Sequence, residues 1–271
     1  MFAQPQNIAS QFLSKDPSTL SPMEKNNLQH QKRVLDEQGF CLLPECLEVT
    51  LADKILAACQ KSFESERKSK LTSSSRGHIY AARNLIRSVP LVKEFWQHGS
   101  LRVFLNSCLG AKFGLVRVLY FDKPPKRTWA LAWHKDTAIP VREHLEQSRH
   151  FTRPTTKAGV PHVIASDTIL RSMVTLRVHL DEVIDDNGPL KVIPQSHLSN
   201  DCLGLGEENA HTVLAKKGEV LAMRPLITHG SAASKPGTQL HRRILHLEYA
   251  SDKTLPDNYQ WHDFVNASDK K

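Results

Sequence analysis

The short tripeptide His134-Lys-Asp136, which follows Trp133, brings an imidazole and a carboxylate close together in the sequence. In an extended strand, side chains two positions apart point to the same face, so this histidine and this aspartate would converge. On a helix the same spacing would place them on nearly opposite sides. At a strand end the tripeptide therefore predicts a two-pronged metal chelate, although an ion pair on the surface is an alternative.

A second histidine follows far along the chain, in Ile227-Thr-His-Gly-Ser231. We expect His229 to end an apolar strand that begins near Glu219. Two imidazoles and one carboxylate hold Fe(II) on one octahedral face and leave three positions open. Zinc more often takes three histidines, two histidines with a glutamate, or cysteines. Taken alone, His229 could equally be a buried histidine with ordinary packing partners.

The third element is the segment 241–249, His-Arg-Arg-Ile-Leu-His-Leu-Glu-Tyr, which follows a turn-rich link over 232–237. The link predicts a hairpin that sets this strand beside the one bearing His229. An arginine pointing inward from the strand could bind a carboxylate through two hydrogen bonds. This favours a dicarboxylate co-substrate that chelates the iron with its other end. The alternative is a surface arginine pair, and the pattern alone leaves Arg242 and Arg243 both open.

Helices are expected to dominate the first 110 residues. Ser21 and Glu24 form a capping box for a helix that runs to about Gln38 and stops at Gly39. A short strand over 40–43 follows, and further helices begin near Thr50, Ser88 and Ser100.

Beyond Gly110 the sequence pattern predicts short strands, over 113–121, 173–180, 190–193, 219–227 and 242–249. Such strands without long intervening helices predict an antiparallel sandwich or barrel. Asp185-Asp-Asn-Gly188 predicts a hairpin turn. The polar segment 141–171 is expected to be a long loop, and such loops are usually functional. The expected organisation is a flexible start (1–20) and one domain (21–271), made of a helical flank (21–110), a β core (111–250) and a tail (251–271).

Composition and charge narrow the classes of protein. The chain has 271 residues, and its five cysteines are odd in number and form no C-x-x-C, which favours free thiols in a reducing cytoplasm. No apolar run is long enough for a membrane span, and the first ten residues lack the pattern of a secretory signal. A net charge of +8 permits an anionic small-molecule substrate. Nucleic acid is not favoured, because no basic stretch is interleaved with aromatic residues.

The chain resembles the phytanoyl-CoA dioxygenase family of Fe(II)/2-oxoglutarate oxygenases. The similar segments lie from about Val116 to Ala250, and more loosely at 36–40. They are Asp122-Lys-Pro-Pro125, Trp133-His-Lys-Asp136, Asp186-Asn-Gly-Pro-Leu-Lys-Val-Ile-Pro-Gln-Ser-His197 and Pro225-Leu-Ile-Thr-His-Gly-Ser231. The resemblance implies a mainly β fold with flanking helices, namely a double-stranded β-helix, which is a jelly-roll barrel.

Residue by residue, the resemblance implies that His134, Asp136 and His229 are the iron ligands. Arg242 matches the arginine that binds the far carboxylate of 2-oxoglutarate, and its spacing to Tyr249 favours it over Arg243. Ser231 matches a serine that contacts the same co-substrate. Two departures point to a rearranged pocket. Arg177 stands where the family's best-known member has a tryptophan, which makes it an extra candidate partner, and Ile244 replaces a small polar residue.

The function expected from the resemblance is a dioxygenase that uses Fe(II), 2-oxoglutarate and O₂ to hydroxylate a small molecule, with succinate and CO₂ as co-products. Two alternatives are kept. One is a metal-binding barrel without catalysis, and the other is a nucleic-acid demethylase of the same metal class, which the net charge of +8 suggests. Neither the substrate nor the oligomeric state can be inferred from the sequence.

Overall fold

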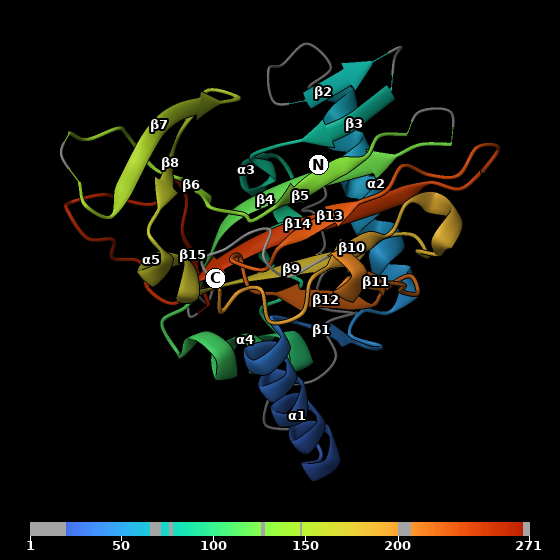
Figure 1. Ribbon diagram of the computed structural model, residues 1–271, viewed down its shortest axis with the longest axis horizontal. Helices are drawn as coiled ribbons and strands as arrows, with labels where there is room; N and C mark the ends of the chain where they lie inside the picture. Colours follow the sequence, from blue (N-terminus) through green and yellow to red (C-terminus); the bar gives the residue numbers. More distant parts are fainter. Residues whose placement is uncertain are drawn as a thin grey trace, which may run out of the picture.

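The protein is described by a computed structural model over residues 20–65, 72–75, 78–125, 128–146, 148–199 and 207–267. Within these ranges the strands form an antiparallel sheet of eight strands, a second sheet of four and a third of three (Figure 1). Side chains of the first two sheets meet, as in the hydrogen bond from Lys123 to Ser231. The two sheets therefore face each other and enclose an interior.

The large sheet carries the longest strands. Its order is β1 (Phe40–Leu43), β12 (Val220–Met223), β9 (Met173–His179), β14 (Arg242–Ala250), β4 (Gly114–Lys123), β3 (His78–Ala82) and β2 (Thr72–Ser75), and β15 (Val265–Asn266) adds to β4. The four-stranded sheet has the order β11 (His211–Val213), β10 (Leu190–Val192), β13 (His229–Ser231) and β5 (Leu131–His134). The third sheet consists of β6 (Ala138–Pro140), β8 (Val160–Ala165) and β7 (Phe151–Lys157).

The helical segments of the N-terminal part lie against the outer face of the large sheet (Figure 1). They are α1 (Pro22–Gln38), α2 (Val49–Ser65), α3 (Leu85–Ser88), the 3₁₀ turn η3 (Pro90–Lys93) and α4 (Gly99–Leu109). The predicted first helix is confirmed, including the Ser21–Glu24 capping box and Gly39 in the left-handed conformation at its end. Shorter elements are α5 (Asp167–Arg171), η4 (Asp185–Asn187) and η5 (Glu207–Asn209).

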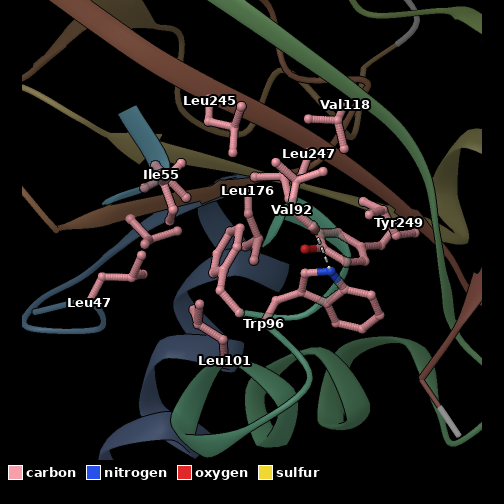
Figure 2. Packing of buried hydrophobic residues seen from close by; sticks show 14 of the residues in the cluster. Leu47, Ile55, Val92, Trp96, Leu101, Val118, Leu176, Leu245, Leu247 and Tyr249 are labelled. Carbon is pink, nitrogen blue, oxygen red and sulfur yellow. Dashed lines mark hydrogen bonds between the residues drawn. The ribbon is translucent and has the colours of Figure 1, made fainter. Parts of the chain in front are cut away.

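Alternation along β14 separates the core from the interior of the barrel. Leu245, Leu247 and Tyr249 point toward the helices and belong to the main hydrophobic cluster (Figure 2). Residues of the other parity, such as Arg242 and His246, point the other way, toward the four-stranded sheet, because strand side chains alternate between faces. The helical layer thus anchors β14 from outside and fixes the direction of its polar residues.

Trp96 is the centre of the packing between the helical layer and β14. Its ring is fully buried and meets the Tyr249 ring edge-on, with centroids 5.0 Å apart, and its Nε1 donates to the Val92 carbonyl over 3.0 Å (Figure 2). We expect Trp96→Ala to lower the free energy of unfolding by about 3–5 kcal/mol, because it leaves a cavity. Chemical denaturation measures this change.

Tyr249→Phe is the matched control for that experiment. The Tyr249 hydroxyl is buried and has no hydrogen-bond partner among the described residues. Its removal keeps the ring contact with Trp96 and relieves an unsatisfied polar group, so we expect unchanged or slightly higher stability. A Trp96→Ala variant as stable as the Tyr249→Phe variant would contradict this account of the core.

The prediction of a hairpin turn at 185–188 is wrong. The segment is a 3₁₀ turn that carries the chain from β9 in the large sheet to β10 in the small one. Asn187 stabilises this crossing, since its side-chain amide donates to the carbonyls of Glu182 and His241 over 2.8 and 3.1 Å. A turn that is held by distant backbone groups cannot be told from a hairpin turn by its composition.

The strand arrangement expected around His229 also needs correction. The predicted single strand is two strands in different sheets, β12 and β13, separated by a turn at Pro225. The segment starting at Arg242 does not lie beside β13, because β10 and β5 occupy both edges of β13 and β14 pairs with β4 and β9. The link after His229 therefore crosses from one sheet to the other.

The segment 141–171, expected to be a loop, contains β7, β8 and α5. The expected loose segment 1–20 lies outside the described residues except for Leu20, which is buried. Four cysteines are unpaired, in agreement with the expected free thiols, and Cys202 lies outside the described residues. No helix in the described ranges combines the length and apolarity that a bilayer crossing requires.

Candidate active site

The structure brings His134, Asp136 and His229 together. His134 is the last residue of β5 and pairs in register with His229, the first residue of β13. Asp136 follows the strand, and its backbone N–H donates to the Pro225 carbonyl over 3.0 Å. Lys135 points away and donates to the Ser196 carbonyl, so the alternation expected for the tripeptide holds beyond the strand end.

The three side chains offer ligand atoms that all lie within 4.8 Å of one another. Nε2 of His134 is 3.8 Å from one carboxylate oxygen of Asp136, and Nε2 of His229 is 3.5 Å from the other. The two imidazole rings have centroids 4.3 Å apart. Within the described residues this is the one group of at least three such side chains.

Backbone carbonyls orient both imidazoles in the same way. Nδ1 of His134 lies 2.8 Å from the Ala132 carbonyl, and Nδ1 of His229 lies 3.0 Å from the Ile227 carbonyl. Because a carbonyl only accepts, each Nδ1 carries the hydrogen and each Nε2 keeps its lone pair. The lone pairs face Asp136, which is how histidines that bind a metal are usually held.

The protonation states suit a metal site as well. Burial lowers the pKa of His229 to about 4, so this ring is neutral at physiological pH. Burial alone would raise the pKa of Asp136, but His229, His246 and His134 together hold it well below the usual range. An ionised carboxylate and neutral imidazoles are the forms that bind a cation. The residues present therefore fit a divalent iron ion.

A row of cations lies in the barrel interior next to this group. Arg242 at the start of β14 and Arg177 on β9 are both buried, and the Nε of each lacks a hydrogen-bond partner among the described residues. Burial, followed by the charge of Arg177, lowers the pKa of Arg242 to about 9. Burial also lowers the pKa of Arg177 to about 10, while Asp136 acts in the opposite direction. An anion would relieve this cost of burying unpaired cations.

Arg243 is engaged elsewhere. Its guanidinium donates to both carboxylate oxygens of Asp181 over 2.7 and 2.6 Å, on the opposite face of β14. Arg242 stays the predicted anchor for the carboxylate, because Arg243 already has an acid partner. Ile244 faces the interior beside His179 in the register of β14 and β9.

Lys123 is an interior cation that the sequence analysis did not single out. It pairs in register with Arg242 and is fully buried. Its Nζ donates to Oγ of Ser231 over 3.0 Å and to the carbonyls of Ala232 and Gly188 over 2.5 and 3.4 Å. The signal was present, since Lys123 ends a mainly apolar strand and lies inside the segment 122–125 that resembles the family.

A buried chain of polar groups behind Asp136 was also missed. Nε2 of His246 lies 3.9 Å from the Asp136 carboxylate and 3.2 Å from that of Glu248. Glu248 in turn forms an ion pair with Arg117 on the neighbouring strand β4. Burial would raise the pKa of Glu248, but Arg117 and His246 hold it below the usual value.

The remaining histidines of interest have structural partners. Nδ1 of His179 donates to the Glu219 carbonyl over 3.0 Å, and burial lowers the pKa of His179 to about 3. His144 lies within hydrogen-bond distance of the carbonyls of Thr155 and His162, at 3.0 and 3.2 Å. His150 pairs with Asp257 at 2.9 Å.

Solved structures share this architecture. The non-heme alpha ketoglutarate dependent epimerase SnoN from nogalamycin biosynthesis superposes with a TM-score of 0.62 at 16% identity, covering 84% of this chain and 82% of that one. EctD from S. alaskensis, solved with 2-oxoglutarate and 5-hydroxyectoine, gives 0.62 at 17% identity, covering 88% and 80%. The carbocyclase SnoK, from the same biosynthesis as SnoN, gives 0.60 at 17% identity, covering 87% and 85%. The predicted double-stranded β-helix is therefore confirmed.

A barrel of this kind with a cluster of two histidines and an aspartate is the framework of a non-heme iron enzyme. The sequence profile of the phytanoyl-CoA dioxygenase (PhyH) family matches residues 35–243, so the chain belongs to this family. Membership confirms the predicted enzyme class, a dioxygenase that depends on Fe(II) and 2-oxoglutarate. No curated protein matches the sequence.

Proposed function

We propose that the protein hydroxylates a small-molecule substrate with Fe(II) held by His134, Asp136 and His229, and that succinate and CO₂ are released. The observation that carries this proposal is the convergence of three ligand atoms within 4.8 Å, with both Nε2 lone pairs directed inward. A bound iron ion supplies the oxidising chemistry.

The residues of the chain bind and orient the reactants in this proposal. Arg242 binds the far carboxylate of 2-oxoglutarate, and Ser231 and Arg177 complete the pocket. The buried, unpaired guanidiniums support these roles, because a dianion would neutralise them. Glu248 and His246 support the Asp136 side, because Nε2 of His246 lies between the two carboxylates.

The first test is an assay of the purified protein with Fe(II), 2-oxoglutarate and O₂ but without a primary substrate. Slow uncoupled formation of succinate is expected, and iron analysis should give one ion per chain. A protein that binds iron without forming succinate would instead be the non-catalytic barrel. Two of the similar structures are an epimerase and a carbocyclase, so the product of the coupled reaction should be checked for incorporation of labelled oxygen from O₂.

Lys123 should tune the affinity for 2-oxoglutarate. Lys123→Met removes a buried charge that adjoins Arg242 and holds Ser231, and a hydrogen bond to a charged group contributes about 1.5–3 kcal/mol. We expect the dissociation constant of 2-oxoglutarate to rise at least about 10-fold. Calorimetric titration of the Mn(II)-loaded protein measures this, and Lys191→Met on β10 is the control, since Lys191 pairs with Gly230 outside the pocket.

The same residue makes the affinity depend on pH. Burial, together with Arg242 and Arg177, lowers the pKa of Lys123 to about 7. The dicarboxylate binds better to the protonated form, so binding should weaken as the pH rises above about 7. Lys123→Met should lose this dependence, and a variant that keeps the wild-type pH profile would exclude Lys123 as its origin.

The small-molecule substrate and the cytoplasmic location stay predictions.

A further inference from the structure

A second group of cations, Arg83, Arg117 and Lys157, lies toward the other end of β14 from Arg242. Arg117 faces Glu248 in the register of β4 and β14, six residues beyond Arg242. At about 3.3 Å per strand residue the two ends are roughly 20 Å apart. Arg117 is therefore distinct from the cations assigned to 2-oxoglutarate, and the Asp136–His246 contact lies between Arg117 and Arg242 along β14.

Strand register places Arg83 beside the middle of β14, two residues from the Arg117–Glu248 pair. Ala81 and Ala82 of β3 pair with Phe121 and Tyr120 of β4, so the next residue, Arg83, lies opposite Leu119. Leu119 in turn pairs with His246 of β14. Arg83 shares the parity of Ala81 and thus faces the barrel interior.

The hairpin of β7 and β8 brings Lys157 to the same place. Nδ2 of Asn84 donates to the Ala158 carbonyl over 3.5 Å, which ties the residue after Arg83 to the residue after Lys157. Asn84 and Ala158 also share the wall of a cavity of about 400 Å³. The segment 141–171, which was expected to be a loop, thus carries a cation to the end of the barrel.

The charges at this end do not balance. The acids whose charges reach the group are Glu248, which is already engaged by Arg117 and His246, and Asp136, which is a proposed metal ligand. Neither Arg83 nor Lys157 forms an ion pair with any described residue, and both are half-buried. Burial, then the charges of Arg117 and Arg83, lowers the pKa of Lys157. Two partly buried cations thus lack an acid of their own, and an anion placed between them would offset their mutual repulsion.

A buried hydrogen-bond acceptor adjoins these cations. His162 on β8 is almost fully buried, and its Nδ1 donates to the Val160 carbonyl over 2.9 Å. Its Nε2 therefore keeps a lone pair, and this buried atom has no partner among the described residues. Such an atom can accept a hydrogen bond from a hydroxyl or N–H group of a ligand.

We propose that Arg83 and Lys157, supported by Arg117, bind an anionic group, a carboxylate or a phosphate, of the molecule that the enzyme oxidises. The inference rests on the proposed function, because an anion bound here is a substrate only if the neighbouring His134, Asp136 and His229 hold the catalytic metal. The Arg117–Glu248–His246 chain connects the anion site to Asp136, so the charged end of the substrate is held one layer of side chains away from the metal ligands.

The test uses probes that share a phenyl ring and differ in the group attached to it, namely benzoate, phenyl phosphate and the uncharged benzamide. The protein is loaded with Mn(II), which supports binding without turnover, and with saturating 2-oxoglutarate, which fills the pocket of Arg242. Each probe is titrated by calorimetry at constant ionic strength. We expect at least one anion to bind 10-fold or more tightly than benzamide, and the preferred anion identifies the group as carboxylate or phosphate.

The double variant Arg83→Gln/Lys157→Gln should weaken binding of the preferred anion at least 10-fold and leave benzamide unchanged. Arg171→Gln is the matched control, because Arg171 is an exposed cation on α5 that pairs with Asp167 and does not line the cavity. The melting temperature of the double variant should equal or exceed that of the wild type, since two repelling charges are removed. A clear drop would mean that the two residues have a structural role instead.

Equal binding of all three probes to the wild type, or an undiminished affinity in the double variant, would overturn the proposal. Failure of the proposed function has a different signature. In that case Mn(II) and 2-oxoglutarate themselves would not bind in the first titration. The difference between wild type and double variant would still report on the second group of cations.

Discussion

Alanine in place of His134 is expected to abolish the formation of succinate from 2-oxoglutarate and to remove iron binding. Only Asp136 and His229 would remain, and two ligands do not define the facial set that holds Fe(II). The fold should survive, because the His134 side chain is 34% exposed and its hydrogen bond is to a backbone carbonyl two residues away. Iron analysis and the succinate assay measure the two effects.

Thermal unfolding provides a readout of the same variant that needs no turnover. A metal present at 100 times its dissociation constant stabilises the folded state by about 2.7 kcal/mol. Wild-type protein should therefore melt at a higher temperature when Mn(II) is added, whereas His134→Ala should not respond. His30→Ala, at an exposed position on α1, is the control and should respond as the wild type does. Full succinate formation by His134→Ala would refute the assignment of the metal site.

The metal group could be predicted from sequence because its geometry is local. His134 and Asp136 are two residues apart, and alternation alone predicts that they converge. The first helix was predictable for the same reason, since Ser21, Glu24 and Gly39 mark its ends. His229 could be added because its residue type and its neighbours match a known pattern, although the strand that carries it was wrongly assigned.

Features that depend on which strands pair could not be predicted in this way. Lys123 meets Ser231 only because β4 and β13 belong to sheets that face each other. The Arg117–Glu248 pair joins residues 131 positions apart, and nothing in either local sequence specifies the other. Pairing of distant strands is decided by the whole core, so residues that act through it are found only in three dimensions.

The β7–β8 hairpin escaped prediction for a different reason. Strand β7 is exposed at five successive positions and contains Pro154, so it shows neither alternation nor an apolar run. Proline and polar residues of this kind are typical of an edge strand, which β7 is in its three-stranded sheet. A strand that buries almost nothing has no hydrophobic signature, yet it brings Lys157 to the end of the barrel.

Arg242→Leu should separate co-substrate binding from stability. Truncating one partner of a buried charge pair costs about 2 kcal/mol or more, so we expect the KM for 2-oxoglutarate to rise at least about 30-fold. The unfolding free energy of the protein without co-substrate should not fall. Leucine replaces a buried guanidinium that lies against Lys123 and Arg177 without an acid partner, and the change removes like-charge repulsion.

Arg243→Leu should show the opposite pattern at the neighbouring position. It breaks the two hydrogen bonds to Asp181 and leaves a mostly buried carboxylate unpaired, so the unfolding free energy should drop by about 1–3 kcal/mol. The KM for 2-oxoglutarate should stay near the wild-type value, because Arg243 points away from the interior. Steady-state kinetics measures the KM of both variants, and chemical denaturation measures their free energies of unfolding. If Arg243→Leu raised KM and Arg242→Leu did not, Arg243 would be the anchor for the carboxylate. The interior cations would then need another ligand.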